Sequence, residues 1–194
     1  MDSNPERDLT RSAPAADVHT APASLHDEGG AAGGRADTLF PWIVGGCILL
    51  ADQITKQFVL ARLVTGDIVP VVGDYLSFTY VRNPGIPFGL HLGAWSRPFF
   101  VVMATIVMGG LIAFYRTVPR AGRLRRLAIA VLCAGALGNL IDRIRWSEGV
   151  VDFIRLSVAG YEWPIFNVAD MAVTTGAILL GISLLAEGRK RRAF

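Results

Sequence analysis

The 194-residue chain has little charge, little histidine and little cysteine. Charged residues make up 18% of it and hydrophobic residues 52%, with a mean hydropathy of +0.44, whereas soluble domains carry about 25% charged residues. An ordinary soluble globular fold is therefore excluded, because so much apolar surface would form large exposed patches. Three histidines and two cysteines leave little material for a His-dependent triad or a metal centre. Cys47 and Cys133 lie in apolar runs, and we predict that both are buried.

The placement of charge adds a second exclusion. The net charge is +3 and the pI is near 9.2, yet the basic residues are neither interleaved with aromatic residues nor aligned along one face. Nucleic acid is therefore not expected as a partner. Residues 1–37 hold seven acidic and three basic side chains and lack hydrophobic periodicity. We expect a disordered tail there and not a secretory signal peptide.

Four apolar segments follow this tail, and each approaches the ~20 residues that cross a bilayer's hydrocarbon core. They run over about residues 39–61, 98–115, 124–141 and 165–186. The second and third are also short enough to be buried core helices. Four such segments in a short chain favour an all-α membrane protein, with a four-transmembrane-helix bundle over residues 38–187.

Arginine placement predicts the orientation of this bundle. The connection over residues 116–126 holds five Arg and no acidic residue, and residues 188–194 are also basic. Positively charged loops stay in the cytoplasm, so both termini should be cytoplasmic, with residues 188–194 as a basic tail. An aromatic belt is expected at the outward interface, and three tryptophans fall there: Trp95, Trp146 and Trp163.

The first of the two outward connections contains strand-like sequence. Val69–Val72 and Tyr75–Val81 are rich in β-branched and aromatic residues, and Gly73-Asp74 separates them. This pattern predicts a small sheet or hairpin on the outer surface. The second connection, Arg143–Pro164, is too long for a tight turn, and we expect it to be a loop.

Several polar side chains lie near the outward ends of the predicted helices, where ionisable groups are costly and need a reason. Asp52 and Lys56 are four residues apart and share a helix face. They form either a structural ion pair or part of an active site. An Asn-x-x-Asp spacing occurs twice, once in the third segment and once in the fourth, at Asn139/Asp142 and Asn167/Asp170.

Two aspartates could form a catalytic pair. Asp152 lies in the second outward connection, and Asp170 lies just inside the fourth segment. If the connection folds back, two carboxylates meet where water is scarce, and both cannot ionise easily. One could then take a proton from water while the other donates to the scissile carbonyl oxygen. The alternative is structural, with aspartates that cap helices or pair with Arg143, Arg145 or Arg155; Asp142–Arg143 in particular is predicted as a structural pair.

Five blocks, in order, resemble the lipoprotein signal peptidases (signal peptidase II, aspartyl peptidase family A8). The resemblance covers about residues 50–185, and its blocks are Ala51–Lys56, Arg82–Gly89, Gly135–Arg143, Val150–Phe153 and Phe166–Asp170. One block departs from the family, because Ile86-Pro87 stands where small residues are usual. Pro87 also lacks a backbone N–H donor.

The resemblance implies an aspartyl endopeptidase of the bacterial inner membrane, active near the periplasmic face. It would remove signal peptides from diacylglyceryl-modified prolipoproteins by cleaving just before the lipidated Cys, and it would bind the cyclic peptide inhibitor globomycin. No cofactor or metal is implied. Asp152 and Asp170 match the catalytic dyad, and Asn83 lies on the periplasmic β-cradle. The positions implied to bind substrate or support the site are Asp52, Lys56, Asn83, Gly85, Phe88, Asn139, Asp142, Arg143 and Asn167.

A different function class remains as the alternative. A small proton- or ion-coupled transporter could use Asp52, Lys56 and Asp170 as a relay. Only four predicted spans and the lack of an internal repeat argue against it. A non-catalytic scaffold would leave the outward polar cluster without a purpose.

Overall fold

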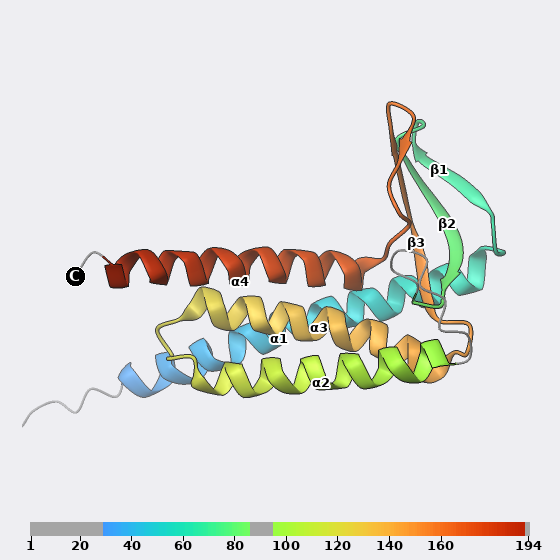
Figure 1. Cartoon of the computed structure of the whole chain (residues 1–194). Coiled ribbons are helices and arrows are strands. Elements are labelled where there is room, and N and C mark those ends of the chain that lie inside the picture. Colours follow the sequence, from blue (N-terminus) through green and yellow to red (C-terminus); the bar gives the residue numbers. More distant parts are fainter. Residues whose placement is uncertain (1–28, 86–94, 193–194) are drawn as a thin grey trace, which may run out of the picture.

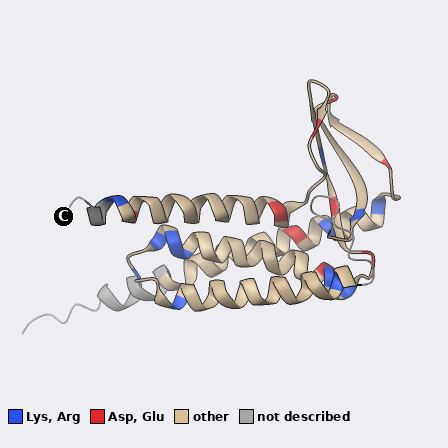
Figure 2. Cartoon of the chain, viewed as in Figure 1, with Lys and Arg blue, Asp and Glu red and all other residues tan. Residues whose placement is uncertain are grey.

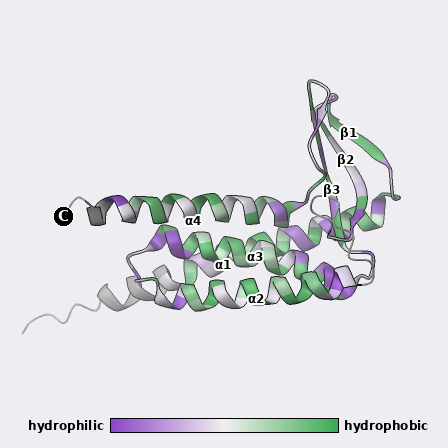
Figure 3. Ribbon diagram, in the orientation of Figure 1, coloured by the Kyte–Doolittle hydropathy of each residue, from purple (hydrophilic) through white to green (hydrophobic). Residues whose placement is uncertain are grey.

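The computed structural model describes residues 29–85 and 95–192. The described residues contain four α-helices with apolar stretches long enough to cross a membrane, so the four predicted spans are confirmed and the chain is a multi-pass membrane protein. Hydrophobic residues run along all of these helices (Figure 3). The helices are α1 (Gly29–Arg62), α2 (Ser96–Thr117), α3 (Arg123–Arg145) and α4 (Val168–Arg192).

The first helix begins earlier than the sequence predicts. α1 starts at Gly29 rather than near residue 39, inside the range that we expected to be a disordered tail. Residues 29–37 include three alanines but also four glycines, so helix propensity does not explain the extension. Extending an existing helix costs far less than nucleating one. Residues 1–28 lie outside the described residues, so the tail stays a prediction there.

α3 is the central helix of the bundle (Figure 1). It packs on α1, α2 and α4, whereas α1 and α2 meet chiefly near one end, where the Trp42 and Tyr115 rings lie 4.8 Å apart. Of the apolar stretch of α3, 56% is buried inside the protein, against 6% for α2. The alternative that the second segment is a buried core helix is therefore wrong. For the third segment it holds in part, because α3 is both a membrane span and part of the core. Cys133 on α3 is buried as predicted, but Cys47 on α1 is exposed.

Glycines allow α3 and α4 to approach closely. A Cβ atom at Gly135 would lie 2.9 Å from Val173 Cγ2 on α4, and one at Gly176 would lie 2.8 Å from the Leu132 backbone nitrogen on α3. Real Cβ atoms essentially never come so near another heavy atom. Small residues thus replace side-chain packing with backbone contact, as is common between membrane helices.

An antiparallel sheet stands at one end of the bundle (Figure 1). The strand order follows the sequence, and the predicted hairpin is confirmed as β1 and β2, with Gly73 between them at φ +46°. The strands are β1 (Ile68–Val72), β2 (Leu76–Asn83), β3 (Val150–Val158) and β4 (Tyr161–Glu162).

β3 corrects the expectation of a loop between the third and fourth spans. Its β-branched residues Val150, Val151 and Ile154 favour a strand, and the edge of β2 supplies the hydrogen-bonding partner. The register places Val81 opposite Asp152 and Asn83 opposite Val150. The sheet therefore brings residues from the first outward connection beside Asp152.

Charge is unevenly distributed along the bundle (Figure 2). The start of α1, the α2–α3 connection and the end of α4 lie at one end, and the sheet lies at the other (Figure 1). Acidic side chains gather toward the sheet, whereas basic side chains lie at both ends, and those of the α2–α3 connection have no acidic residue among them in residues 116–126. This arrangement agrees with a chain whose two termini lie on the same side of a membrane.

Candidate active site

Asp152 lies on β3 and is almost fully enclosed, with 2% of its surface exposed. Its two carboxylate oxygens accept different amide donors. Asn83 Nδ2 donates to Oδ2 at 2.8 Å, and Asn167 Nδ2 donates to Oδ1 at 2.6 Å. Buried polar groups need such partners, so both oxygens are fixed in position by side chains from β2 and from the segment before α4.

Asp170 lies in the first turn of α4, and a reciprocal cap fixes it there. Asn167 Oδ1 accepts the Asp170 backbone N–H at 2.9 Å, and Asp170 Oδ2 accepts the Asn167 backbone N–H at 3.1 Å. This is the arrangement of a capping box. It places Asn167 just before the helix, although the predicted fourth span includes this residue, and it explains one of the two Asn-x-x-Asp spacings.

Two asparagines link the carboxylates. Asn139 Nδ2 donates to Asp170 Oδ1 at 2.8 Å, and its own Oδ1 accepts Asn167 Nδ2 at 3.2 Å. Asn167 Nδ2 also donates to Asp152, so an amide chain runs from one carboxylate to the other. The structure thus brings Asp152 and Asp170 into one site, as the sequence predicts.

The enclosure of Asp152 changes its acidity. Burial raises the pKa of Asp152 to about 7, because desolvation penalises the charged form, and the charge of Asp170 acts in the same direction. The hydrogen bonds from Asn83 and Asn167 and the charge of Lys56 oppose this rise in pKa. A large share of molecules therefore carries a proton on Asp152 at neutral pH.

Lys56 forms a buried ionic network beside the pair. Its Nζ lies 2.9 Å from Asp52 Oδ2, 2.9 Å from Asp142 Oδ2 and 3.1 Å from Asn139 Oδ1. All three ionic side chains are nearly inaccessible. The ion pair expected between Asp52 and Lys56 is thus present, and it extends to α3.

The carboxylates of this network hold the backbone next to each candidate catalytic residue. Asp52 Oδ1 accepts the Ala169 N–H at 2.9 Å, one residue before Asp170. Asp142 Oδ2 accepts the Val151 N–H at 3.1 Å, one residue before Asp152. Lys56 contacts both carboxylates, so the backbone of β3 and that of the start of α4 are both held through the same ammonium group. Its contacts favour a positioning role for Asp52 and Lys56.

Asn83 is oriented by its own turn. The Gly85 N–H donates to Asn83 Oδ1 at 2.9 Å, which leaves Nδ2 to face Asp152. Gly85 has φ +87°, a conformation that favours glycine, and a Cβ there would lie 2.6 Å from the Phe100 ring. Phe88, Ile86 and Pro87 lie outside the described residues.

Arg143 does not pair with Asp142 as predicted. Consecutive helix residues point in different directions, and Asp142 faces Lys56 instead. Arg143 Nη1 donates to the Asn139 carbonyl at 3.3 Å, and its guanidinium lies over the Phe100 ring. Its Nε is buried and has no hydrogen-bond partner among the described residues. Arg155 pairs with Glu162, and no arginine in the described part of the chain forms an ion pair with Asp152 or Asp170, although both charges act on Arg143. The capping part of the structural alternative is confirmed, because Asp170 caps α4 together with Asn167.

Two residues of the site region escaped sequence analysis. Arg97 Nε donates to the Arg143 carbonyl and Nη2 to the Ile144 carbonyl, both at 2.8 Å, which satisfies carbonyls at the end of α3. Nothing in the sequence links residues so far apart. Gly138 is the second, because a Cβ there would lie 2.6 Å from Asp52 Oδ2. In the sequence, its position next to Asn139 is the feature that could have indicated that Gly138 belongs to the site.

A buried and a half-buried carboxylate, joined by amides at the end of a membrane bundle, have the parts of a membrane-embedded aspartic peptidase. Within the described residues no group of three or more His, Cys, Asp and Glu side chains could hold a metal ion. The model of the signal peptidase (SPase) II family, peptidase A8, matches residues 44–186. The chain belongs to this signal peptidase II family, which decides against the transporter alternative.

Individual relatives agree with this membership. A lipoprotein signal peptidase of Syntrophus aciditrophicus (strain SB) is 37% identical over 152 residues, covering 77% of this chain and 94% of the relative. One from Staphylococcus carnosus (strain TM300) is 40% identical over 145 residues, covering 75% and 89%. A solved structure described as a bacterial membrane enzyme, obtained by the in meso method, matches with a TM-score of 0.70 at 34% identity, covering 77% of this chain and 89% of that one.

Proposed function

We propose that the chain removes signal peptides from diacylglyceryl-modified bacterial prolipoproteins and cleaves just before the lipidated Cys. Asp152 and Asp170 are the catalytic dyad of this proposal. The observation that carries it is the pair of carboxylates joined through Asn139 and Asn167. The substrate class rests on the names of the relatives, which are lipoprotein signal peptidases.

The protonation of the pair assigns a role to each member. Asp152, whose pKa is raised to about 7 by burial, is the acid. Asp170 accepts two N–H donors at the start of α4, where the helix dipole favours negative charge, and it is the base. Water attacks the scissile carbonyl carbon while Asp170 takes a proton from it and Asp152 gives its proton to the carbonyl oxygen.

Collapse of the resulting gem-diol completes the reaction. Asp170 gives its proton to the leaving nitrogen, the C–N bond breaks, and a hydroxyl of the gem-diol returns a proton to Asp152. Both carboxylates then regain their starting states. Asn83, Asn139 and Asn167 hold the oxygens in place through these steps without adding charge. The unpaired Nε of Arg143 is a donor for the substrate backbone.

The position of the pair suits a substrate that arrives in the membrane. A cavity of about 370 Å³ opens beside Asp170, lined also by Trp163, Phe166, Met171, Thr174 and Thr175. We place the sheet, as the β-cradle, and the dyad near the periplasmic face of the inner membrane, because the arginine-rich connection lies at the opposite end of the bundle. Both termini are then cytoplasmic.

Single substitutions test this proposal. Asp152→Asn and Asp170→Asn should each abolish cleavage of a diacylglyceryl-modified prolipoprotein in detergent, measured by gel shift, while the unmodified precursor stays uncut by every variant. Asp74→Asn, at an exposed position in the β1–β2 turn, is the matched control and should retain full activity. Full activity in Asp170→Asn would overturn the mechanism. Globomycin should inhibit the unaltered protein.

A further inference from the structure

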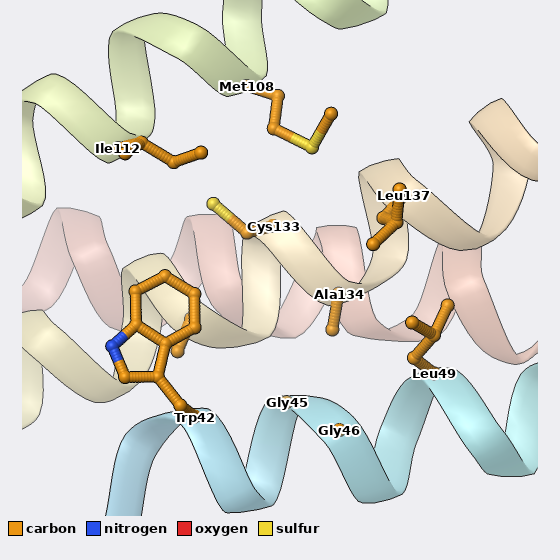
Figure 4. A pocket seen from close by; sticks show the side chains of 10 residues that line it. Trp42, Gly45, Gly46, Leu49, Met108, Ile112, Cys133, Ala134 and Leu137 are labelled. Atoms are coloured by element: carbon orange, nitrogen blue, oxygen red, sulfur yellow. The ribbon is translucent and has the colours of Figure 1, made fainter. Parts of the chain in front are cut away.

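An apolar groove lies on α3 between α1 and α2. It exists because these two helices pack on α3 and meet each other chiefly near Trp42 and Tyr115. Figure 4 shows Met108 and Ile112 facing Trp42 and the glycines of α1 across Cys133. The groove is lined by Trp42, Gly45, Gly46, Leu49, Met108, Ile112, Ala130, Cys133, Ala134 and Leu137.

The size and chemistry of the groove limit which kind of molecule can bind in it. Its volume is about 250 Å³, whereas one helical turn, about 5.4 Å long and 10 Å across, fills roughly 400 Å³. A helix is therefore too large for the groove, whereas part of a hydrocarbon chain, which is only one methylene wide, can lie in it. The lining is almost wholly apolar, and the helices that form it lie in the bilayer, where acyl chains are the surrounding solvent.

One end of the groove leads to basic side chains. Trp42, which lines the groove, packs on Tyr115 with ring centroids 4.8 Å apart, and the Arg126 guanidinium lies 4.5 Å from the centroid of the same Tyr115 ring. Arg126 is one helical turn before Ala130 and so shares its face of α3. Its side chain is 8% exposed, and its Nε has no hydrogen-bond partner among the described residues.

The same end carries the α2–α3 connection, in which residues 116–126 include five arginines and no acidic residue. Arg116 and Arg120 are exposed. A basic pocket between membrane helices at the level of the lipid headgroups is suited to an anionic phosphate. Arg126 Nε is a buried donor that a phosphate oxygen would satisfy.

We propose that this groove binds one anionic phospholipid, with an acyl chain against Gly46 and Cys133 and its phosphate at Arg126 and the neighbouring arginines. The site is separate from the candidate dyad. Gly135 and Gly138 of α3 meet α4, whereas Ala130, Cys133 and Ala134 face the groove. The lipid thus fills a space between α1 and α2 that the protein leaves open.

Filling the groove tests the proposal. A Cβ at Gly46 would have no heavy atom within 4 Å, so Gly46→Leu should fold and occupy the groove, and Gly46→Ala should fill less of it. Gly181→Leu on α4, equally open, is the matched control. The probes are phosphatidylglycerol and phosphatidylcholine with the same acyl chains, titrated into the delipidated full chain and followed by native mass spectrometry.

We expect phosphatidylglycerol to bind about tenfold or more tightly than phosphatidylcholine. Gly46→Leu should weaken phosphatidylglycerol binding at least about tenfold, Gly46→Ala should weaken it less, and Gly181→Leu should leave it unchanged. Equal affinity for both lipids would overturn the role of the arginines. Unchanged binding to Gly46→Leu, or equal losses in Gly46→Leu and Gly181→Leu, would overturn the groove as the site.

Discussion

At the scale of single residues, asparagine side chains set the geometry around both carboxylates. Asn83 and Asn167 donate to opposite oxygens of Asp152, and Asn139 donates to Asp170. An amide presents a donor and an acceptor at fixed positions and does not titrate. In the mechanism that we propose, the carboxylates therefore exchange a proton with substrate while their surroundings keep the same charge.

The acid role of Asp152 predicts the pH dependence of cleavage. With burial holding its pKa at about 7 in the protein without substrate, kcat/KM should fall about tenfold per pH unit above that value, as the acid loses its proton. The Asn83 hydrogen bond lowers this pKa. Asn83→Ala should therefore move the descending limb of the kcat/KM profile to higher pH. A limb that stays in place or moves to lower pH would contradict this assignment.

The same pKa predicts how stability depends on pH. The pKa of Asp152 is about 7 in the folded protein against 3.8 for an ordinary Asp, so the folded state binds the proton more tightly. This contribution to stability is fully present below pH 3.8 and is lost as pH rises through about 7. The melting temperature in detergent should fall between pH 6 and 8, and Asp152→Asn should show a weaker slope. Parallel slopes would count against a raised pKa.

The buried network predicts a large cost for removing Lys56. Lys56→Met leaves Asp52 and Asp142 buried without their cation, and loss of one partner from a buried ion pair costs about 3–5 kcal/mol. We expect a lower melting temperature and lost cleavage. Adding Asp142→Asn should restore part of the stability, because one unpaired charge is removed while an acceptor for Val151 N–H remains. A double variant as unstable as the sum of the two single variants would show that charge is not the cause.

At the scale of elements, close contacts between helices determine which groups the acidic side chains can contact. Gly138 on α3 faces Asp52 on α1, and Asp52 in turn holds the Ala169 N–H at the start of α4. Three helices thus meet around one position that has no side chain. The distance between α1 and α3 at this level sets the placement of Asp170.

This contact predicts different effects for two glycine substitutions. Gly138→Ala would bring Cβ within 2.6 Å of Asp52 Oδ2, so we expect it to displace Asp52 and to lower kcat about tenfold or more. Gly181→Ala meets no atom within 4 Å and should keep full activity, with stability unchanged or raised by about 0.5–1 kcal/mol. The check is kcat and melting temperature for both variants. Equal activity in the two would contradict the role of the close approach.

The elements also show how far the sequence predicts the fold. Long apolar runs predict all four spans, because their signal is local. β3 escapes prediction because a short apolar run becomes a strand only when another strand offers its edge, here β2. At the site, the sequence predicts Asp152 and Asp170, but it assigns Asp142 to Arg143 instead of Lys56. That partner lies on a different helix, and only packing determines it.

At the scale of the whole molecule, charge, termini and the candidate site are all distributed along the long axis of the helix bundle. The arginine-rich connection over residues 116–126 and the end of α4 lie opposite the sheet, which stands beside Asp152 and Asp170. Membrane insertion retains arginine-rich loops in the cytoplasm. In the orientation that we propose, the candidate dyad lies on the outer side, where exported lipoprotein precursors would present their cleavage site.

This orientation predicts which positions a membrane-impermeant maleimide reaches. In a background with Cys47→Ala and Cys133→Ala, Asp74→Cys in the β1–β2 turn should react in intact spheroplasts. Ala121→Cys in the α2–α3 connection should react only after lysis, because five arginines hold that connection inside. Both positions are exposed in the structure, so a difference in labelling reports the side of the membrane. The reverse labelling pattern would place the dyad at the cytoplasmic face and exclude cleavage of exported precursors there.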